Sequence, residues 1–127
     1  MTVSTLTAKD ADAVLRRMYY YDADYDSEHW GELAYSLSAS VRWDSESRIH
    51  VPIEPGADFE GMRVVCVQDE GGGEGEGETR FAVFSFTDET GTRYFRKDGF
   101  YASYDGTTWD GDFREVTPKE KVVTFYE

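Results

Sequence analysis

The sequence contains a single cysteine, Cys66, in a chain of 127 residues. One cysteine excludes an intramolecular disulfide and every zinc site that needs several thiolates. No apolar run approaches the roughly 18 residues that a membrane-spanning helix needs. The first residues, MTVSTLTAKDADAV, lack the basic start and the apolar centre of a signal peptide. These absences predict a soluble protein that acts in the cytoplasm.

Basic residues are also few, because 13 Lys and Arg stand against 26 Asp and Glu, and the formal net charge is -13. Charge of this sign repels nucleic acid and anionic membranes, so direct binding to either is not expected. Hydrophobic residues make up 39% of the chain, which is too many for a disordered acidic protein. We expect one folded domain over residues 1–127. The acidity can serve recognition of a partner or only solubility.

A helix is predicted over residues 8–19. Thr7 and Asp10 form the pattern of a capping box at its start. The apolar residues that follow fall at helical spacing: Ala11, Val14, Leu15 and Met18. Because this apolar stripe is one-sided, the helix should lie on a sheet rather than inside a bundle.

Apolar and small polar residues then alternate, which predicts a long strand over residues 33–43. The side chains expected to share the core with the helix are Leu33, Leu37, Val41 and Trp43. A DSES turn leads into a second strand through Ile49, Val51 and Ile53, and Pro52 places that strand at an edge.

Further strands are predicted over residues 62–68, 80–87, 92–97, 100–104, 113–116 and 121–126. The dipeptide Asp98-Gly99 is typical of a two-residue hairpin turn. One helix followed by a run of strands predicts an α+β fold, with the N-terminal helix packed on a twisted antiparallel meander sheet of about seven strands.

The stretch GGGEGEGE lies between two predicted strands and is an acidic loop candidate. On an extended backbone, Glu74, Glu76 and Glu78 would lie on one side, about 6.7 Å apart. Glycine is costly to order, so a solvated hairpin loop is favoured over a calcium site. A second acidic stretch, DADYDSEHWGEL, has Ser27 where a calcium loop requires glycine. No metal and no other cofactor is therefore expected.

No catalytic motif is present. Cys66 lies in VVCVQ, where a free cysteine usually behaves as a small buried hydrophobe, and no histidine is near it in the sequence. With 26 carboxylates, some pairs meet by chance, so paired acids indicate little. An enzyme is not expected. The alternative, a small carboxylate-dependent hydrolase, would need a deep pocket with convergent acids of perturbed pKa.

Aromatic residues beside acids favour protein binding instead, because exposed Tyr and Trp anchor interfaces. The residues predicted to bind a partner with a basic surface are Glu74, Glu76, Glu78, Tyr104, Trp109 and Asp110.

Three segments of the C-terminal half carry a resemblance: GGGEGEGETR, RYFRKDGFYASYDGTTWDGDFREV and KVVTFYE. Over residues 70–127 the chain resembles small accessory proteins encoded by bacteriophages of actinobacteria. The resemblance implies a phage protein that acts inside the infected host and binds and modulates a host protein, as an inhibitor or anti-defence factor.

A further alternative is a DNA mimic that occupies a nucleic-acid-binding groove. A DNA strand carries one charge per 3.4 Å of axis, whereas one alternating Glu row supplies one per about 6.7 Å. Mimicry would therefore require a second acidic row, Asp22, Asp24 and Asp26, beside the glutamates.

Overall fold

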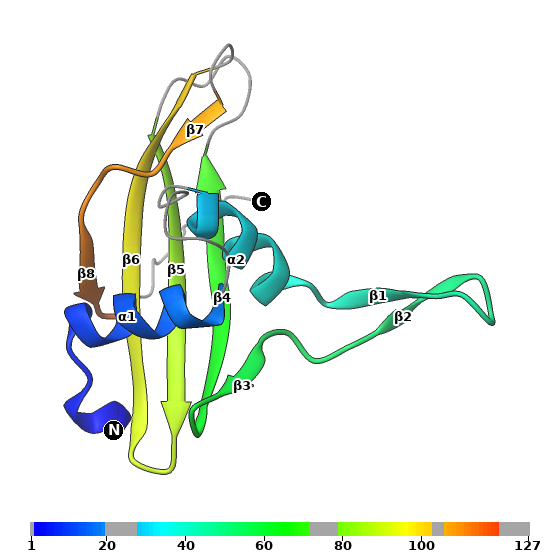
Figure 1. Cartoon of the computed structure of the whole chain (residues 1–127), viewed down its shortest axis with the longest axis horizontal. Coiled ribbons are helices and arrows are strands. Elements are labelled where there is room, and N and C mark those ends of the chain that lie inside the picture. Colours follow the sequence, from blue (N-terminus) through cyan, green and yellow to red (C-terminus); the bar gives the residue numbers. More distant parts are fainter. Residues whose placement is uncertain (1, 20–27, 72–78, 103–105, 120–127) are drawn as a thin grey trace, which may run out of the picture.

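The computed structural model describes residues 2–19, 28–71, 79–102 and 106–119. Within them it has the predicted α+β fold, in which two α-helices lie over one face of an antiparallel sheet (Figure 1). In chain order the elements are η1 (Val3–Thr5), α1 (Ala8–Met18), α2 (Glu28–Ser38), β1 (Val41–Asp44), β2 (Ile49–Pro52), β3 (Ala57–Phe59), β4 (Met62–Gly71), β5 (Thr79–Asp88), β6 (Gly91–Ala102), β7 (Gly106–Thr108) and β8 (Phe113–Val116).

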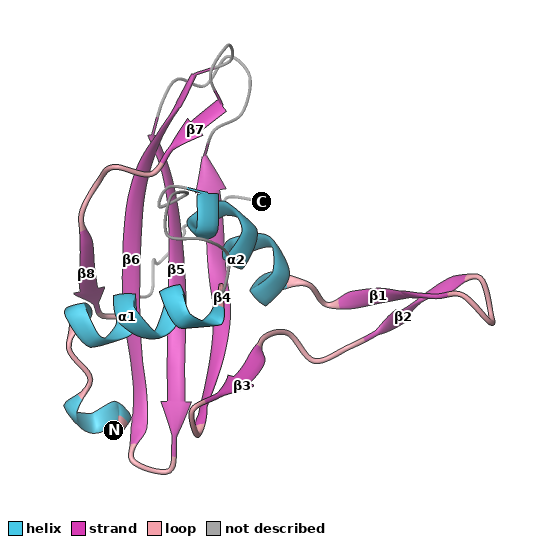
Figure 2. Ribbon diagram, in the orientation of Figure 1, coloured by secondary structure: helices cyan, strands magenta, loops and turns pink. Residues whose placement is uncertain are grey.

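The strands form two separate sheets (Figure 2). The main sheet is a meander in the order β3-β4-β5-β6-β7. Strand β8 also pairs with β6, on the edge that β7 uses, because β5 occupies the other edge. The second sheet is the two-stranded ribbon of β1 and β2, which extends away from the body (Figure 1). The single predicted meander is therefore a meander with a separate ribbon.

The core lies between the helices and the main sheet. The stripe of α1 is buried there, as predicted, with Met18 partly buried beside it. The core contains Trp30, whose ring centroid lies 5.0 Å from that of Phe113 and 6.1 Å from that of Phe84. The buried side chains from helices and sheet form one cluster: Ala11, Val14, Leu15, Trp30, Leu33, Leu37, Met62, Val64, Phe84, Phe86 and Phe95 among them.

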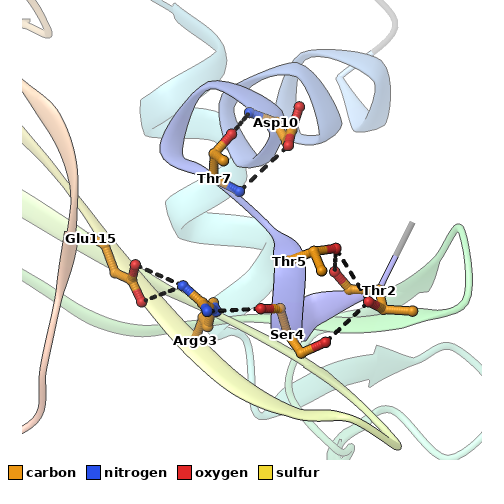
Figure 3. A network of polar contacts seen from close by, with 7 residues as sticks. All are labelled: Thr2, Ser4, Thr5, Thr7, Asp10, Arg93 and Glu115. Carbon is orange, nitrogen blue, oxygen red and sulfur yellow. Dashed lines mark hydrogen bonds and ion pairs between the residues drawn. The ribbon is translucent and has the colours of Figure 1, made fainter.

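Polar contacts tie the N-terminal segment to the sheet (Figure 3). The predicted capping box is confirmed, since the backbone N–H of Asp10 donates to Oγ1 of Thr7 at 3.2 Å and the Asp10 carboxylate accepts from the Thr7 N–H. Arg93 on β6 donates to the carbonyl of Ser4 at 2.8 Å and pairs with Glu115 on β8 at 2.9 Å. Helix α1 therefore starts from a point fixed to two strands.

The strand predicted over residues 33–43 is wrong, because its first part is the second half of helix α2. The buried residues of α2 are Trp30, Leu33, Ala34 and Leu37, which stand at the i, i+3, i+4 and i+7 positions of one helical face. Tyr35, which a strand would place beside Leu33 and Leu37, is 77% exposed. Leu33 and Leu37, four residues apart, fit the period of a strand as well as that of a helix. Trp30 favours the helix, because it lies three residues before Leu33 and is buried on the same helical face.

The core face predicted for the end of that strand is wrong for two residues. Leu33 and Leu37 do reach the core, from the helix. Val41 and Trp43 belong to β1, outside the main sheet, and both are exposed. Neither helix covers the ribbon that contains them (Figure 1).

The hairpin predicted at Asp98-Gly99 is also wrong, because β6 runs through both residues without a turn. The Asp98 carboxylate accepts hydrogen bonds from Arg96, at 2.8 Å, and from Arg114. A Cβ on Gly99 would lie 2.9 Å from the ring of Trp109. This glycine makes room for a tryptophan and does not close a turn.

Candidate functional site

The residues that connect the ribbon to the main sheet are held in place against β4. After β2 the chain returns to the sheet at Gly56, which has a φ of +94°, and a Cβ there would lie 2.4 Å from the carbonyl oxygen of Val64. The guanidinium of Arg63 on β4 donates to the carbonyls of Glu54, at 3.3 Å, and Pro55, at 2.7 Å. The close approach and the two hydrogen bonds fix the direction in which the ribbon projects.

We call residues 41–52 the arm. Its strands pair in antiparallel register, with Val41 opposite Pro52 and Trp43 opposite His50. The rings of Trp43 and His50 meet edge to face with centroids 5.3 Å apart. A two-stranded ribbon without a sheet or helix against it is marginally stable in water. The arm therefore depends on its turn and on what it contacts.

The turn at the tip of the arm is organised by Asp44. Its carboxylate accepts hydrogen bonds from Oγ of Ser47 at 2.6 Å and from the backbone N–H of Glu46 at 3.4 Å. Arg48 closes the turn with a φ of +58°, and its N–H donates to the Asp44 carbonyl at 2.8 Å. The Ser47 hydroxyl, followed by the backbone donors, holds the pKa of Asp44 below its ordinary value.

The arm should consequently loosen in acid. The lowered pKa of Asp44 means that its ionised form favours the folded turn, so this contribution is present at neutral pH and is lost as pH falls through the lowered pKa. Carboxyl NMR titration should place Asp44 below an ordinary aspartate. Ser47→Ala should raise that pKa toward the ordinary value, whereas Ser38→Ala, at the end of α2, should leave it unchanged. A titration unaffected by Ser47→Ala would contradict the assignment.

Apolar side chains cover the arm although no core lies against it. The exposed fractions are 49% for Val41, 56% for Trp43 and 57% for Ile49. Six large hydrophobic side chains are exposed in the described part of the chain, and these three lie within the eight residues of β1 and β2. Large apolar side chains gathered on a projecting element are typical of an interaction surface.

The residues predicted to bind a partner do not meet at one described place. Glu74, Glu76, Glu78 and Tyr104 lie outside the described residues, as do Asp22, Asp24, Asp26 and the strand predicted over residues 121–126. Asp110 is exposed. Trp109, which we expected to be exposed, is buried and lies under the Arg80 guanidinium, 5.0 Å from the ring centroid.

Six of the described acids form ion pairs with arginines. The ion pairs are Asp12–Arg16, Asp58–Arg63, Glu60–Arg17, Asp69–Arg80, Asp98–Arg96, Asp98–Arg114 and Glu115–Arg93. The hydrogen bonds of Arg17 lower the pKa of Glu60, and those of Arg114 and Arg96 lower the pKa of Asp98 against the opposing effect of burial. A catalytic acid at neutral pH needs its pKa raised instead.

The described residues offer neither a metal centre nor a bilayer-spanning helix. No three His, Cys, Asp or Glu side chains within these ranges are grouped so that they could hold a metal ion. None of the helices described is long and apolar enough to cross a membrane.

A groove of about 480 Å³ lies along β4, beside the only cysteine. Its lining is Ser38, Pro55, Val65, Cys66, Val67, Gln68 and Asp69. The Cys66 thiol donates to the carbonyl of Gln68 at 3.4 Å. Burial, followed by the charge of Asp69, raises the pKa of Cys66 to about 11. A thiol held in its protonated form is a poor nucleophile.

Cys66 should therefore resist modification in the folded protein. At pH 8 its raised pKa leaves roughly a hundredfold less thiolate than an unperturbed cysteine would have. We expect slow reaction with a disulfide reagent in buffer and fast reaction after unfolding in guanidinium chloride. Equal rates in both conditions would mean that the thiol is accessible and ionised in the fold.

Comparisons of this chain with protein-family models, with curated proteins and with solved structures gave no match. The hairpin of β1 and β2 was predicted from the DSES turn between two alternating runs, and its pairing is confirmed. Its separation from the main sheet was not predicted, because alternation places Val41 and Trp43 on a strand face without showing what covers that face.

Proposed function

We propose that the protein is a small non-enzymatic accessory protein that binds another protein through the arm. The observation that carries this proposal is the exposure of Val41, Trp43 and Ile49 on a projecting ribbon. Tryptophan is enriched among the residues that dominate binding energy at interfaces. Burying these side chains against a partner would also supply the packing that a two-stranded ribbon lacks.

The setting that we propose is the cytoplasm of an infected host, where a phage-type protein of this kind would inhibit or redirect a host protein. The whole chain carries a net charge of -13, and this negative charge would attract a partner with a basic surface. In this proposal the acids, Glu74, Glu76 and Glu78 included, increase the association rate, and the apolar side chains of the arm slow dissociation.

The alternatives have less support. A DNA mimic needs rows of unpaired acids, whereas six of the described acids are in ion pairs with arginine. A carboxylate-dependent hydrolase needs an acid of raised pKa, and the resolved shifts at Asp44, Glu60, Asp88 and Asp98 are all downward. Neither arrangement explains an apolar arm.

Site-specific photocrosslinking tests the proposal. A photoreactive phenylalanine analogue is placed at Trp43 in the full chain, and the protein is irradiated inside the cells that make it. The control position is Tyr35, an aromatic residue on α2 with a higher exposed fraction of 77%. We expect discrete protein adducts from position 43 and few from position 35. Absence of adducts at 43, or the same adducts at both positions, would contradict binding through the arm.

A further inference from the structure

We propose that the arm binds a second copy of this chain, by pairing of the two β1 strands about a two-fold axis at Trp43. The product is a four-stranded antiparallel sheet in which each β1 lies between its own β2 and the other β1. This inference rests on the proposed function, because it uses the same arm. Strand pairing takes up only the backbone edge of β1, whereas side chains project from the faces of the ribbon and stay available to the host protein.

The backbone of β1 has one open edge. The N–H of Ile53 donates to the carbonyl of Ser40 at 2.9 Å, which fixes Ser40 as a residue facing β2. In an antiparallel ladder such residues alternate, so the backbone groups of Arg42 and Asp44 also face β2. Those of Val41 and Trp43 consequently point to the opposite edge, which no strand of the described part of the chain covers.

The outer edge of β2 is closed by proline. Pro52 lies opposite Val41, so by the same alternation its nitrogen points away from β1, where it has no hydrogen to donate. Proline at such a position is a common way to prevent a further strand from joining an edge. The arm therefore has one blocked edge and one edge that can accept a strand.

The sequence of β1, VRWD, is self-complementary about Trp43. With the axis there, each Trp43 lies opposite its copy and can exchange two backbone hydrogen bonds with it. Arg42 of each copy then lies opposite Asp44 of the other copy, which gives two pairs of opposite charge. Aromatic pairs and opposite charges are favourable cross-strand neighbours. An axis at Arg42 or Asp44 would instead oppose like charges and use backbone groups that already face β2.

Charge also favours contact at the arm. Arg42 and Arg48 balance Asp44 and Glu46, so residues 41–52 carry no net charge, and all of the -13 belongs to the rest of the chain. Antiparallel pairing places the two acidic bodies at opposite ends of the paired strands. A strand of four residues is about 14 Å long. The two acidic bodies are therefore held apart by more than the Debye length, which is roughly 8 Å at physiological salt.

The contact is small, and this sets the expected strength. Pairing one short edge buries less than the roughly 1,200 Å² of a stable specific interface. We therefore expect a dimer in rapid exchange with monomer, whose population rises as the protein concentration rises from micromolar toward millimolar.

Charge reversal tests the register by sedimentation velocity on the full chain. Arg42→Asp alone opposes two carboxylates in each half of the pair, and Asp44→Arg alone opposes two arginines. Because Asp44 also holds the turn of the arm, Ser47→Ala, which removes the same hydrogen bond without a change of charge, is measured beside it and should still associate. Each variant alone should associate at least tenfold more weakly than the wild type, which corresponds to about 1.4 kcal/mol. An equimolar mixture of the two variants should form a heterodimer, because every facing pair is then of opposite charge. Lys9→Asp makes the same charge change on the exposed side of α1, outside the arm, and should leave association unchanged.

The outcomes separate this inference from the proposed function. Recovery of association in the mixture supports the two-fold pairing even if each variant is somewhat destabilised. A wild-type protein that stays monomeric at every concentration, a mixture that stays monomeric, or an equal loss in Lys9→Asp would overturn it. If the protein is monomeric but Trp43 crosslinks to a different protein, the second copy is rejected and the proposed function stands. If the protein is monomeric and position 43 gives no crosslinked adducts, both the pairing of two copies and the proposed function are rejected.

Discussion

Replacing Trp30 with alanine is expected to lower the free energy of unfolding by about 3–5 kcal/mol, as for other buried aromatic residues. Trp30 is only 2% exposed and is the largest fully buried side chain. Its ring packs on Phe113 and Phe84, and the ammonium of Lys97 lies 5.1 Å from its centroid. The substitution would open a cavity bordered by α2, β5, β6 and β8, which cannot all move inward to fill it.

Unfolding in denaturant, monitored by circular dichroism, measures this loss of stability. A second tryptophan, Trp43, provides the control. Trp43→Ala removes the same side chain from the arm, where 56% of it is exposed, and should change stability by no more than about 0.5 kcal/mol. Similar losses in the two variants would mean that the arm packs on the body.

Replacing Leu37 with alanine is expected to cost about 2–5 kcal/mol, because this side chain is 3% exposed in the core. Tyr35→Ala should cost little, since that side chain points to solvent from the same helix. In a strand, residues 35 and 37 would share one face and the two substitutions would act together. The pair therefore tests the helical register of α2 directly.

The same unfolding measurement applies to both variants, and Leu33→Ala provides a positive control one helical turn before Leu37. A large loss on Tyr35→Ala with little loss on Leu37→Ala would contradict the helix. The helical content lost in each case can be followed at the same time by far-ultraviolet circular dichroism.

Helix α1 could be predicted because several local signals agree. The capping box of Thr7 and Asp10 marks its start, and the apolar stripe has only helical spacing. Strands β4, β5 and β8 were predictable for a similar reason, because their β-branched and aromatic residues match their environment. Helix α2 was not predictable from alternation, since leucines at 33 and 37 satisfy a period of two as well as one helical turn.

The two other differences depend on which elements of the fold lie beside the residues in question, and the sequence pattern does not show this. Asp98-Gly99 has the composition of a turn, but Arg114 binds the aspartate and Trp109 occupies the space beside the glycine. For the arm, apolar residues at Val41 and Trp43 predict burial only if another element covers them. In this fold no described element does, and burial inside the monomer cannot be read from the residue type alone.

One edge of β6 is paired in two separate stretches, one with β8 and one with β7, and we expect the two regions to differ in local stability. Residues 94–97 pair with β8 next to the aromatic core, whereas residues 100–102 pair with the three-residue strand β7, where Phe100 is 49% exposed. We therefore expect backbone amides near β8 to exchange their hydrogens with solvent only when the whole domain unfolds, and those near β7 to exchange through a limited opening. Such an opening should stop at Trp109, which lies between the two regions and is buried.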